Sequence, residues 1–143
     1  MFCYFDNSAT TQVSARAFSI LQKTMLEDYG NPSSKHVKGV EAERYVRDAA
    51  EKIAKTLKAS PKELVFTSGG TESDNLAIIG SALMRKGRGR HLITSAIEHP
   101  AVYTAMDFLV EQGFELTVLP VDGSGHVDVD DLNLLINAIL GAD

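Results

Sequence analysis

Two patterns of hydrophobic residues alternate along the second half of the chain. Short runs rich in apolar and β-branched residues are typical of strands, and they occur at residues 64–67, 91–95 and 115–121. Elsewhere apolar side chains recur every three or four residues, which predicts helices at residues 71–84, after Pro100 and after Asp128. This order of strand, helix, strand, helix, strand, helix predicts an α/β layered fold with a mainly parallel sheet and flanking helices.

The first 60 residues have a different pattern, in which helices and loops dominate. Residues 1–5 predict a short strand. Ser14 is a predicted N-cap for a helix whose apolar face carries Phe18, Leu21 and Met25. The sequence Gly-Asn-Pro-Ser-Ser at residues 30–34 ends this helix. A longer helix follows, with an apolar stripe made of Val46, Ala49, Ala50, Ile53 and Leu57.

Capping signals mark several further helix boundaries. Residues 60–63 (Ser-Pro-Lys-Glu) have the form of a capping box. The helix after Pro100 would end at Gly113, and its inward side chains would be Val102, Met106, Leu109 and Val110. Asp128 can cap a last helix, whose apolar residues are Leu132, Leu135, Ile136 and Ile139.

Composition and charge exclude several classes of function. The net charge is −5, so broad electrostatic attraction to nucleic acid or anionic lipid is not expected. The one basic cluster, at residues 85–90, is interpreted as a solvated turn rather than an RNA-binding arm. No apolar run is long enough to cross a bilayer, and the start lacks the features of a signal peptide. The single cysteine, Cys3, is interpreted as a small buried residue, and we expect a cytoplasmic protein.

The most informative stretch is residues 66–75, where a predicted strand runs through a glycine pair into a helix. Glycine lets the backbone approach an anion, and the first amides of a helix favour negative charge. Thr71 adds a hydroxyl donor beside Gly70. The stretch is neither a Walker loop nor a G-x-G-x-x-G motif. From the residues alone, it is either a phosphate cradle or an ordinary strand-to-helix turn.

His99 lies just after the next predicted strand and just before the next helix. Ligands of open α/β sheets bind beyond the carboxyl ends of strands, so His99, Gly70 and Thr71 are expected to face one crevice. A histidine there can stack on a flat ring or move a proton. The segment alone is also consistent with a histidine that only caps a helix or lies on the surface. The other histidines have no metal-ligand spacing, so no metal site is predicted.

Four segments together resemble the NifS/IscS group of cysteine desulfurases, within the class V aminotransferase family. They are residues 6–11, 30–36, 67–75 and 95–102, and residues 119–122 continue the likeness. The resemblance covers residues 3–133 and only the first part of a family member. It implies part of the large domain of the fold type I transferases that depend on pyridoxal 5'-phosphate (PLP). Residues 1–60 would be an N-terminal segment of helices and signature loops, and residues 61–143 the first strands and helices of the PLP-binding domain.

The resemblance also implies roles for individual residues. Gly70 and Thr71 match the positions that hold the cofactor phosphate, and His99 matches the histidine that stacks over the pyridine ring and assists proton transfer. A further set belongs to signature segments near the substrate or the dimer interface: Asn7, Thr10, Asn31 and His36. Ser8 replaces the usual alanine.

Other residues that the family needs would lie downstream of residue 143. They are the Schiff-base lysine, the aspartate against the pyridine nitrogen, the arginine for the substrate carboxylate and the cysteine that accepts sulfur. None of the eight lysines matches the Schiff-base position, and Cys3 does not match the sulfur acceptor. This chain alone is therefore expected to be inactive.

The expected activity of the parent protein is removal of sulfur from L-cysteine, which leaves L-alanine and an enzyme persulfide. The resemblance implies a homodimer and a sulfur-acceptor protein such as an iron–sulfur scaffold, with no nucleic-acid or membrane partner. Two alternatives remain at this point. One is another class V enzyme such as a selenocysteine lyase, and the other is a non-catalytic remnant or dimerising module.

Overall fold

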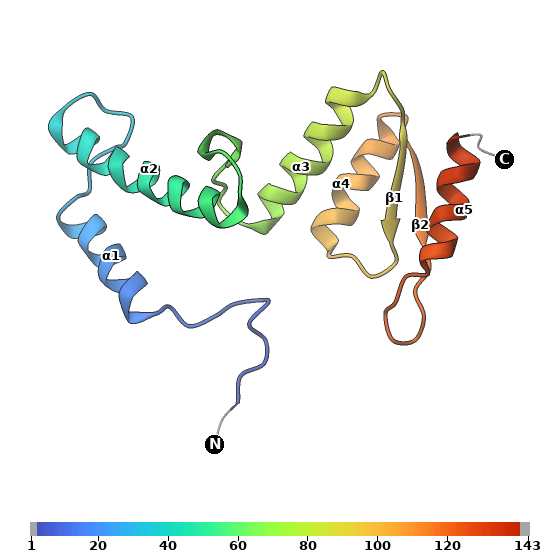
Figure 1. Cartoon of the computed structure of the whole chain (residues 1–143), viewed down its shortest axis with the longest axis horizontal. Coiled ribbons are helices and arrows are strands. Elements are labelled where there is room, and N and C mark those ends of the chain that lie inside the picture. The colour runs from blue at the N-terminus through green and yellow to red at the C-terminus, as the bar shows by residue number, and fades with distance from the viewer. Residues whose placement is uncertain (1–2, 141–143) are drawn as a thin grey trace. The chain divides into compact units, whose positions relative to one another are not determined.

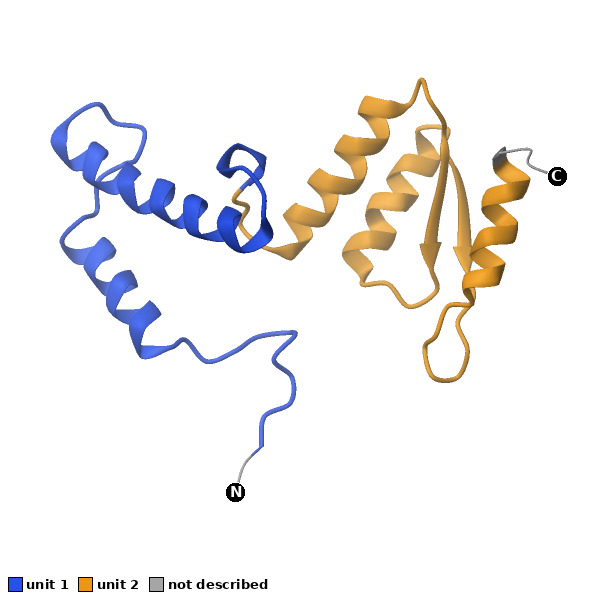
Figure 2. Cartoon of the chain, viewed as in Figure 1, with its two compact units in different colours: residues 1–65 blue, residues 66–143 orange. Residues whose placement is uncertain are grey.

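The computed structural model describes residues 3–140, and the chain divides into two compact units, residues 1–65 and 66–143 (Figures 1 and 2). Within each unit, local sequence signals determine where the helices begin and end.

The first unit consists of helices and loops. Helix α1 spans Ala15–Leu26, helix α2 spans Val37–Leu57, and a short 3-10 turn, η1, spans Pro61–Glu63. Ser14 caps α1, because its hydroxyl accepts a hydrogen bond of 3.2 Å from the Ala17 amide. The predicted capping box is also present, since the Ser60 amide donates to the Glu63 carboxylate at 2.6 Å. Both predicted helices and the break between them are confirmed.

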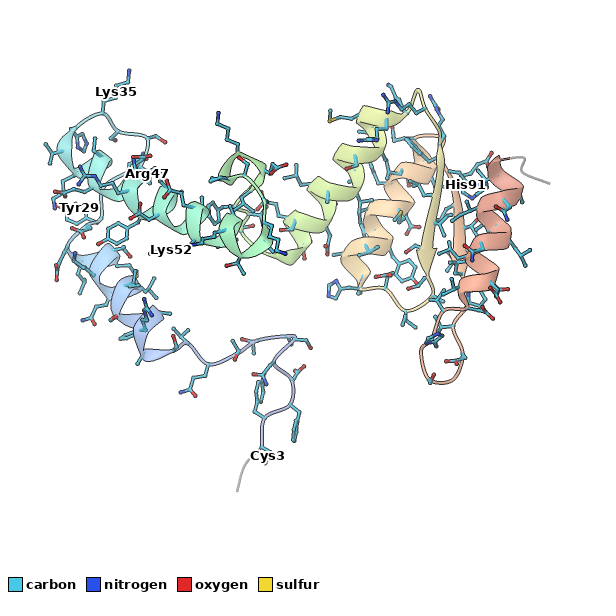
Figure 3. The ribbon with its side chains drawn as sticks, in the orientation of Figure 1. Cys3, Tyr29, Lys35, Arg47, Lys52 and His91 are labelled. Carbon is cyan, nitrogen blue, oxygen red and sulfur yellow. The ribbon has the colours of Figure 1, made fainter. Side chains whose placement is uncertain are left out.

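Other predictions for the first unit are wrong. Residues 3–5 form no strand, and residues 1–2 lie outside the described part of the chain. Cys3 is exposed rather than buried (Figure 3). The apolar face of α1 is likewise exposed, with Phe18 at 56% and Met25 at 68%. Spacing of apolar residues predicts which side chains share a helix face, but burial requires a second surface to cover that face.

The second unit is an α/β assembly. Its elements are α3 (Gly70–Arg85), β1 (His91–Ser95), α4 (Pro100–Glu111), β2 (Glu115–Leu119) and α5 (Val129–Leu140) (Figure 1). Strands β1 and β2 pair in parallel, with His91 opposite Glu115 and Ser95 opposite Leu119. Helix α4 connects the two parallel strands, which is the βαβ unit that the alternating pattern predicts.

The core of this unit lies between α4 and the strands. Leu109 is fully buried, and the other buried apolar side chains are Ala101, Ala105, Met106, Phe114 and Leu119. Gly113 has a φ of 85°, the left-handed conformation that suits glycine at the end of a helix, so the predicted stop after α4 is confirmed. Asp128 likewise caps α5, because its carboxylate accepts a bond of 2.8 Å from the Asp130 amide.

A histidine joins the two strands. Nε2 of His91 lies 2.8 Å from Oγ1 of Thr117, and Nδ1 lies 3.4 Å from a carboxylate oxygen of Glu115. His91 therefore contacts the residue directly opposite it on β2, Glu115, and the residue two positions further along the same strand, Thr117. Such cross-strand contacts add to the stability of the observed register of β1 against β2.

Three predictions for the second half need correction. Residues 64–67 form no strand, because a strand requires a hydrogen-bonded neighbour and none pairs with them among residues 3–140. Strand β2 ends at Leu119 rather than at residue 121. Val110 is 43% exposed and does not point inward, whereas the small residues Ala101 and Ala105 do.

Candidate functional site

The N-terminus of α3 presents open backbone donors. Gly70, Thr71 and Glu72 are the first three residues of the helix, so their amides have no acceptor within it. No side chain caps this end, and the first helical bond runs from the Ser73 amide to the Gly69 carbonyl at 3.1 Å. A Cβ added at Gly69 or Gly70 would meet no atom within 4 Å, so the backbone is accessible from solvent. These features fit a phosphate, which needs several donors and close approach to the backbone.

Neighbouring side chains hold this turn without occupying those donors. The Glu72 carboxylate accepts bonds of 2.6 Å from both the hydroxyl and the amide of Ser68. These bonds, the hydroxyl first, lower the pKa of Glu72. The hydroxyls of Thr67 and Ser73 lie 2.6 Å apart. The loop is therefore fixed by its own side chains, and the amides of Gly70 and Thr71 remain exposed.

His99 is the N-cap of α4. Its Nδ1 accepts a hydrogen bond of 3.1 Å from the Ala101 amide, and its backbone is extended, with φ of −64° and ψ of 147°. The sequence left open whether His99 caps a helix, and in the structure it does. It does not exclude a ligand role, because a cap uses one ring nitrogen and leaves the ring faces and Nε2 uncommitted. The His99 residue is exposed.

The segment before His99 is also ordered by hydrogen bonds. The Ser95 hydroxyl donates to the Glu98 carboxylate at 2.8 Å. The Tyr103 hydroxyl donates to the Ser95 carbonyl at 2.7 Å, and the Ala96 amide donates to the Leu119 carbonyl at 2.9 Å. Sequence analysis did not identify Tyr103, although its position one turn after His99 was a usable signal.

The second unit brings three of the predicted site residues to one end. Helices α3 and α4 pack against each other, and both begin at the end toward which the arrows of β1 and β2 point (Figure 1). Gly70 and Thr71 start α3, and His99 starts α4. All three therefore lie at the carboxyl end of the parallel strands, where open α/β sheets bind ligands.

The other four predicted residues belong to the first unit. Asn7 accepts a bond of 3.0 Å from the Thr11 hydroxyl, and the carbonyl of Thr10 accepts one of 3.1 Å from Tyr4. Asn31 accepts a bond of 2.9 Å from the Ser33 amide. These bonds show two ordered polar turns.

His36 is the N-cap of α2 and accepts a bond of 3.4 Å from the Gly39 amide at Nδ1. The loop before α2 packs tightly on the start of that helix. A Cβ at Gly30 would overlap the Lys38 carbonyl, and one at Gly39 would overlap the Ser34 carbonyl. Glycine is therefore required at both positions for the close approach of two backbone segments.

A charged cluster that sequence analysis missed closes the base of the same loop. The Asp28 carboxylate accepts a bond of 2.7 Å from the Tyr45 hydroxyl and lies 3.1 Å from Nζ of Lys23. Lys38 lies 3.9 Å from Asp28 and 3.1 Å from Glu41. These bonds, with that from Tyr45 the largest influence, lower the pKa of Asp28. The cluster ties the end of α1 to the middle of α2.

Within residues 3–140, no three His, Cys, Asp or Glu side chains are grouped so that they could hold a metal ion. Over the same part of the chain, no helix combines the length and apolar character that a membrane span needs.

Comparison with known proteins identifies the relatives of the chain. Cysteine desulfurase IscS of Dictyoglomus turgidum is 46% identical over 129 residues, which are 90% of this chain and 33% of that protein. The mitochondrial cysteine desulfurase of Arabidopsis thaliana is 40% identical, over 96% of this chain and 31% of its own length. The chain thus spans about a third of the curated relatives it matches.

Solved structures give the same result. A NifS-like protein has a TM-score of 0.86 and 42% identity, over 94% of this chain and 37% of that one. A structure described as SspA in complex with cysteine has a TM-score of 0.82 and 38% identity, over 92% and 38% of the two chains. The predicted α/β fold, as an incomplete part of the fold type I large domain, is confirmed, and so is the resemblance to cysteine desulfurases. The family model for class V aminotransferases matches residues 3–140, and the chain therefore belongs to that family.

Proposed function

We propose that this chain is the N-terminal portion of a PLP-dependent cysteine desulfurase, which takes sulfur from L-cysteine and leaves L-alanine and an enzyme persulfide. The observation that carries the proposal is the open end of α3, where the amides of Gly70 and Thr71 are uncapped. It is supported by 46% identity to a cysteine desulfurase. The uncapped amides and this similarity together favour the interpretation that the start of α3 binds the phosphate of a cofactor, rather than being an ordinary strand-to-helix turn.

The residues of the second unit would bind and orient the cofactor. The amides of Gly70 and Thr71 and the Thr71 hydroxyl would hold its phosphate, with the positive end of the α3 dipole adding to the attraction. His99 would stack on its ring. When bound, PLP supplies the electron sink for carbanion chemistry, so the protein has only to position it and manage protons. In this proposal residues 61–143 are the first part of the PLP-binding domain.

The first unit would contribute contacts near the substrate. The side chains of Asn7, Asn31 and His36 each accept a local hydrogen bond. Thr10 is held through its backbone carbonyl, which accepts a bond from Tyr4. Residues 1–60 would form this segment. Ordered amide and imidazole groups are suited to contact a polar amino-acid substrate, and we assign the four residues this role.

The remaining parts of the proposal follow from family membership. We propose that the parent protein is a cytoplasmic homodimer. Its partner would be a sulfur-acceptor protein such as an iron–sulfur scaffold. Because none of the eight lysines matches the Schiff-base position, the 143 residues alone would bind PLP without a specific covalent bond and would not release alanine. This last point also keeps a non-catalytic or dimerising fragment as the second candidate.

A titration of the isotopically labelled chain with PLP tests the cradle, with pyridoxal as the matched ligand that lacks the phosphate. We expect PLP to shift the amide resonances of Gly70 and Thr71 first, and pyridoxal to shift them much less. Equal shifts with both ligands, or PLP shifts confined to other residues, would remove the phosphate assignment.

A further inference from the structure

The hydrogen bond that caps α4 determines which nitrogen of His99 carries a proton. The Ala101 amide lies 3.1 Å from Nδ1. A backbone amide can only donate, so Nδ1 must offer a lone pair and cannot hold a proton while the bond exists. In the neutral ring the proton is therefore on Nε2.

The turn that contains this bond is attached to the sheet at one defined point. The amides of Val102 and Tyr103 donate to the His99 carbonyl, at 2.9 and 3.4 Å. The half-buried Tyr103 then reaches back, and its hydroxyl donates to the carbonyl of Ser95, the last residue of β1, at 2.7 Å. This bond connects the first turn of α4 directly to the end of the strand.

The buried side of the same turn adds to the restraint. Ala101 and Ala105 are buried on the face of α4 that meets the core, with exposed fractions of 7% and 0%. The Ala101 amide therefore has little freedom to rotate away from His99. The position of the donor is set by packing, and the position of the turn is set by Tyr103.

We propose that the first turn of α4 holds His99 with its proton on Nε2, so that the ring meets a bound ligand as a hydrogen-bond donor, and that Tyr103 is the positioning residue for this turn. The inference rests on the proposed function for its ligand. In this state the Nε2–H of His99 donates a hydrogen bond to the ligand. The ring can accept a proton only at Nδ1, and only after the hydrogen bond from the Ala101 amide has opened. A base that removes a proton from the substrate would then be another group.

Nitrogen NMR of the labelled 143-residue chain without cofactor tests the first part. The exposed His126, whose ring makes no hydrogen bond to any of residues 3–140, serves as the internal reference. At alkaline pH, we expect the population ratio of the Nε2–H to the Nδ1–H form to be roughly fivefold higher at His99 than at His126, the effect of one ordinary hydrogen bond. A scalar coupling between the Ala101 amide nitrogen and Nδ1 should accompany it. Equal ratios at the two histidines, or no coupling, would overturn the inference.

Tyr103→Phe tests the second part, with Tyr4→Phe as the matched control. Both variants lose a tyrosine hydroxyl that donates to a backbone carbonyl, and Tyr4 lies in the other unit. We expect Tyr103→Phe to bring the ratio of Nε2–H to Nδ1–H at His99 toward the ratio at His126, and to weaken the coupling between Nδ1 and the Ala101 amide nitrogen. Tyr4→Phe should leave both unchanged. If the proton ratio and the coupling of His99 are the same in Tyr103→Phe as in the unmodified chain, Tyr103 does not position this turn.

If the Tyr103→Phe chain does not fold, the positioning role can still be tested on the unmodified chain. In the unmodified chain the Tyr103 hydroxyl proton should exchange with solvent more slowly than that of Tyr4, and equal exchange would contradict the positioning role. Neither experiment contains PLP. A failure here therefore leaves the phosphate cradle intact, and a failure of the PLP titration leaves the tautomer of His99 intact.

Discussion

The hydroxyl of Tyr45 in α2 donates a hydrogen bond of 2.7 Å to the carboxylate of Asp28, two residues beyond the end of α1. Lys23 contacts both groups, with Nζ 3.1 Å from the carboxylate and 3.2 Å from the phenol oxygen. The bond lies at the base of the loop that carries Asn31 and His36. The conformation of that loop therefore depends on the ionised carboxylate of Asp28.

Tyr45→Phe should raise the pKa of Asp28 toward the ordinary carboxyl value, because the bond from Tyr45 is the main cause of its lowering. A carboxylate with a lowered pKa in the folded state stabilises the fold above the ordinary pKa of about 3.9, and this contribution is lost as pH falls through the folded value. The variant should lose this part of the acid dependence. Carbon NMR of the Asp28 carboxylate measures the midpoint, with the exposed Tyr29→Phe as control. An unshifted midpoint in Tyr45→Phe would contradict the assignment.

Gly39→Ala and Gly80→Ala should change stability in opposite directions. A Cβ at Gly39 would overlap the Ser34 carbonyl, so the loop or the helix must move, at a cost of about 1–3 kcal/mol. Gly80 lies inside α3 with no atom within 4 Å of an added Cβ, and alanine there should stabilise the helix by about 0.5–1 kcal/mol.

Amide hydrogen exchange read separately in α2 and α3 measures both effects. Faster exchange in α2 is expected for Gly39→Ala and slower exchange in α3 for Gly80→Ala. If the exchange rates in α2 are the same with alanine at position 39, the close contact with Ser34 is not a constraint in solution.

Local signals made most of the helices predictable. The caps at Ser14, Ser60 and Asp128 depend on side chains that reach amides two or three residues away, so the sequence contains the whole interaction. The phosphate-cradle hypothesis is local in the same sense, because a glycine pair before a helix fixes where uncapped amides lie.

Long-range features were not predictable in this way. The Tyr45–Asp28 bond joins residues 17 apart in the chain, and no periodicity reports it. Residues 64–67 have the composition of a strand but lack a paired neighbour among the described residues, so composition alone gave the wrong result. The faces of α1 and α5 show the same limit, since Met25 is 68% exposed and Ile139 is 41% exposed.

In the full-length protein, Thr71→Ala should weaken retention of PLP by roughly 10- to 150-fold. The change removes one hydroxyl donor to a phosphate dianion, and a charge-assisted hydrogen bond is worth about 1.5–3 kcal/mol. Equilibrium dialysis against PLP measures the loss. Thr71→Ser, which keeps the hydroxyl, should restore binding. Thr56→Ala should have no effect, because that hydroxyl bonds only within α2, to the Lys52 carbonyl at 3.1 Å. Retention by Thr71→Ala equal to that of the unmodified protein would contradict the role of the hydroxyl.

His99→Asn and His99→Ala together should separate the two roles of this residue. Asparagine is among the best N-caps, so His99→Asn should keep the stability of α4. Alanine cannot cap, and His99→Ala should lower the free energy of unfolding by about 1 kcal/mol. Both variants lose the aromatic ring, and with it the stacking surface and the Nε2–H donor. In the cofactor-loaded full-length enzyme both should therefore change the absorption spectrum of PLP and slow alanine formation by about 100-fold or more. Denaturation curves, absorption spectra and turnover are measured on the same preparations. If His99→Asn has a normal spectrum and normal turnover while His99→Ala is merely less stable, His99 is only the cap of α4.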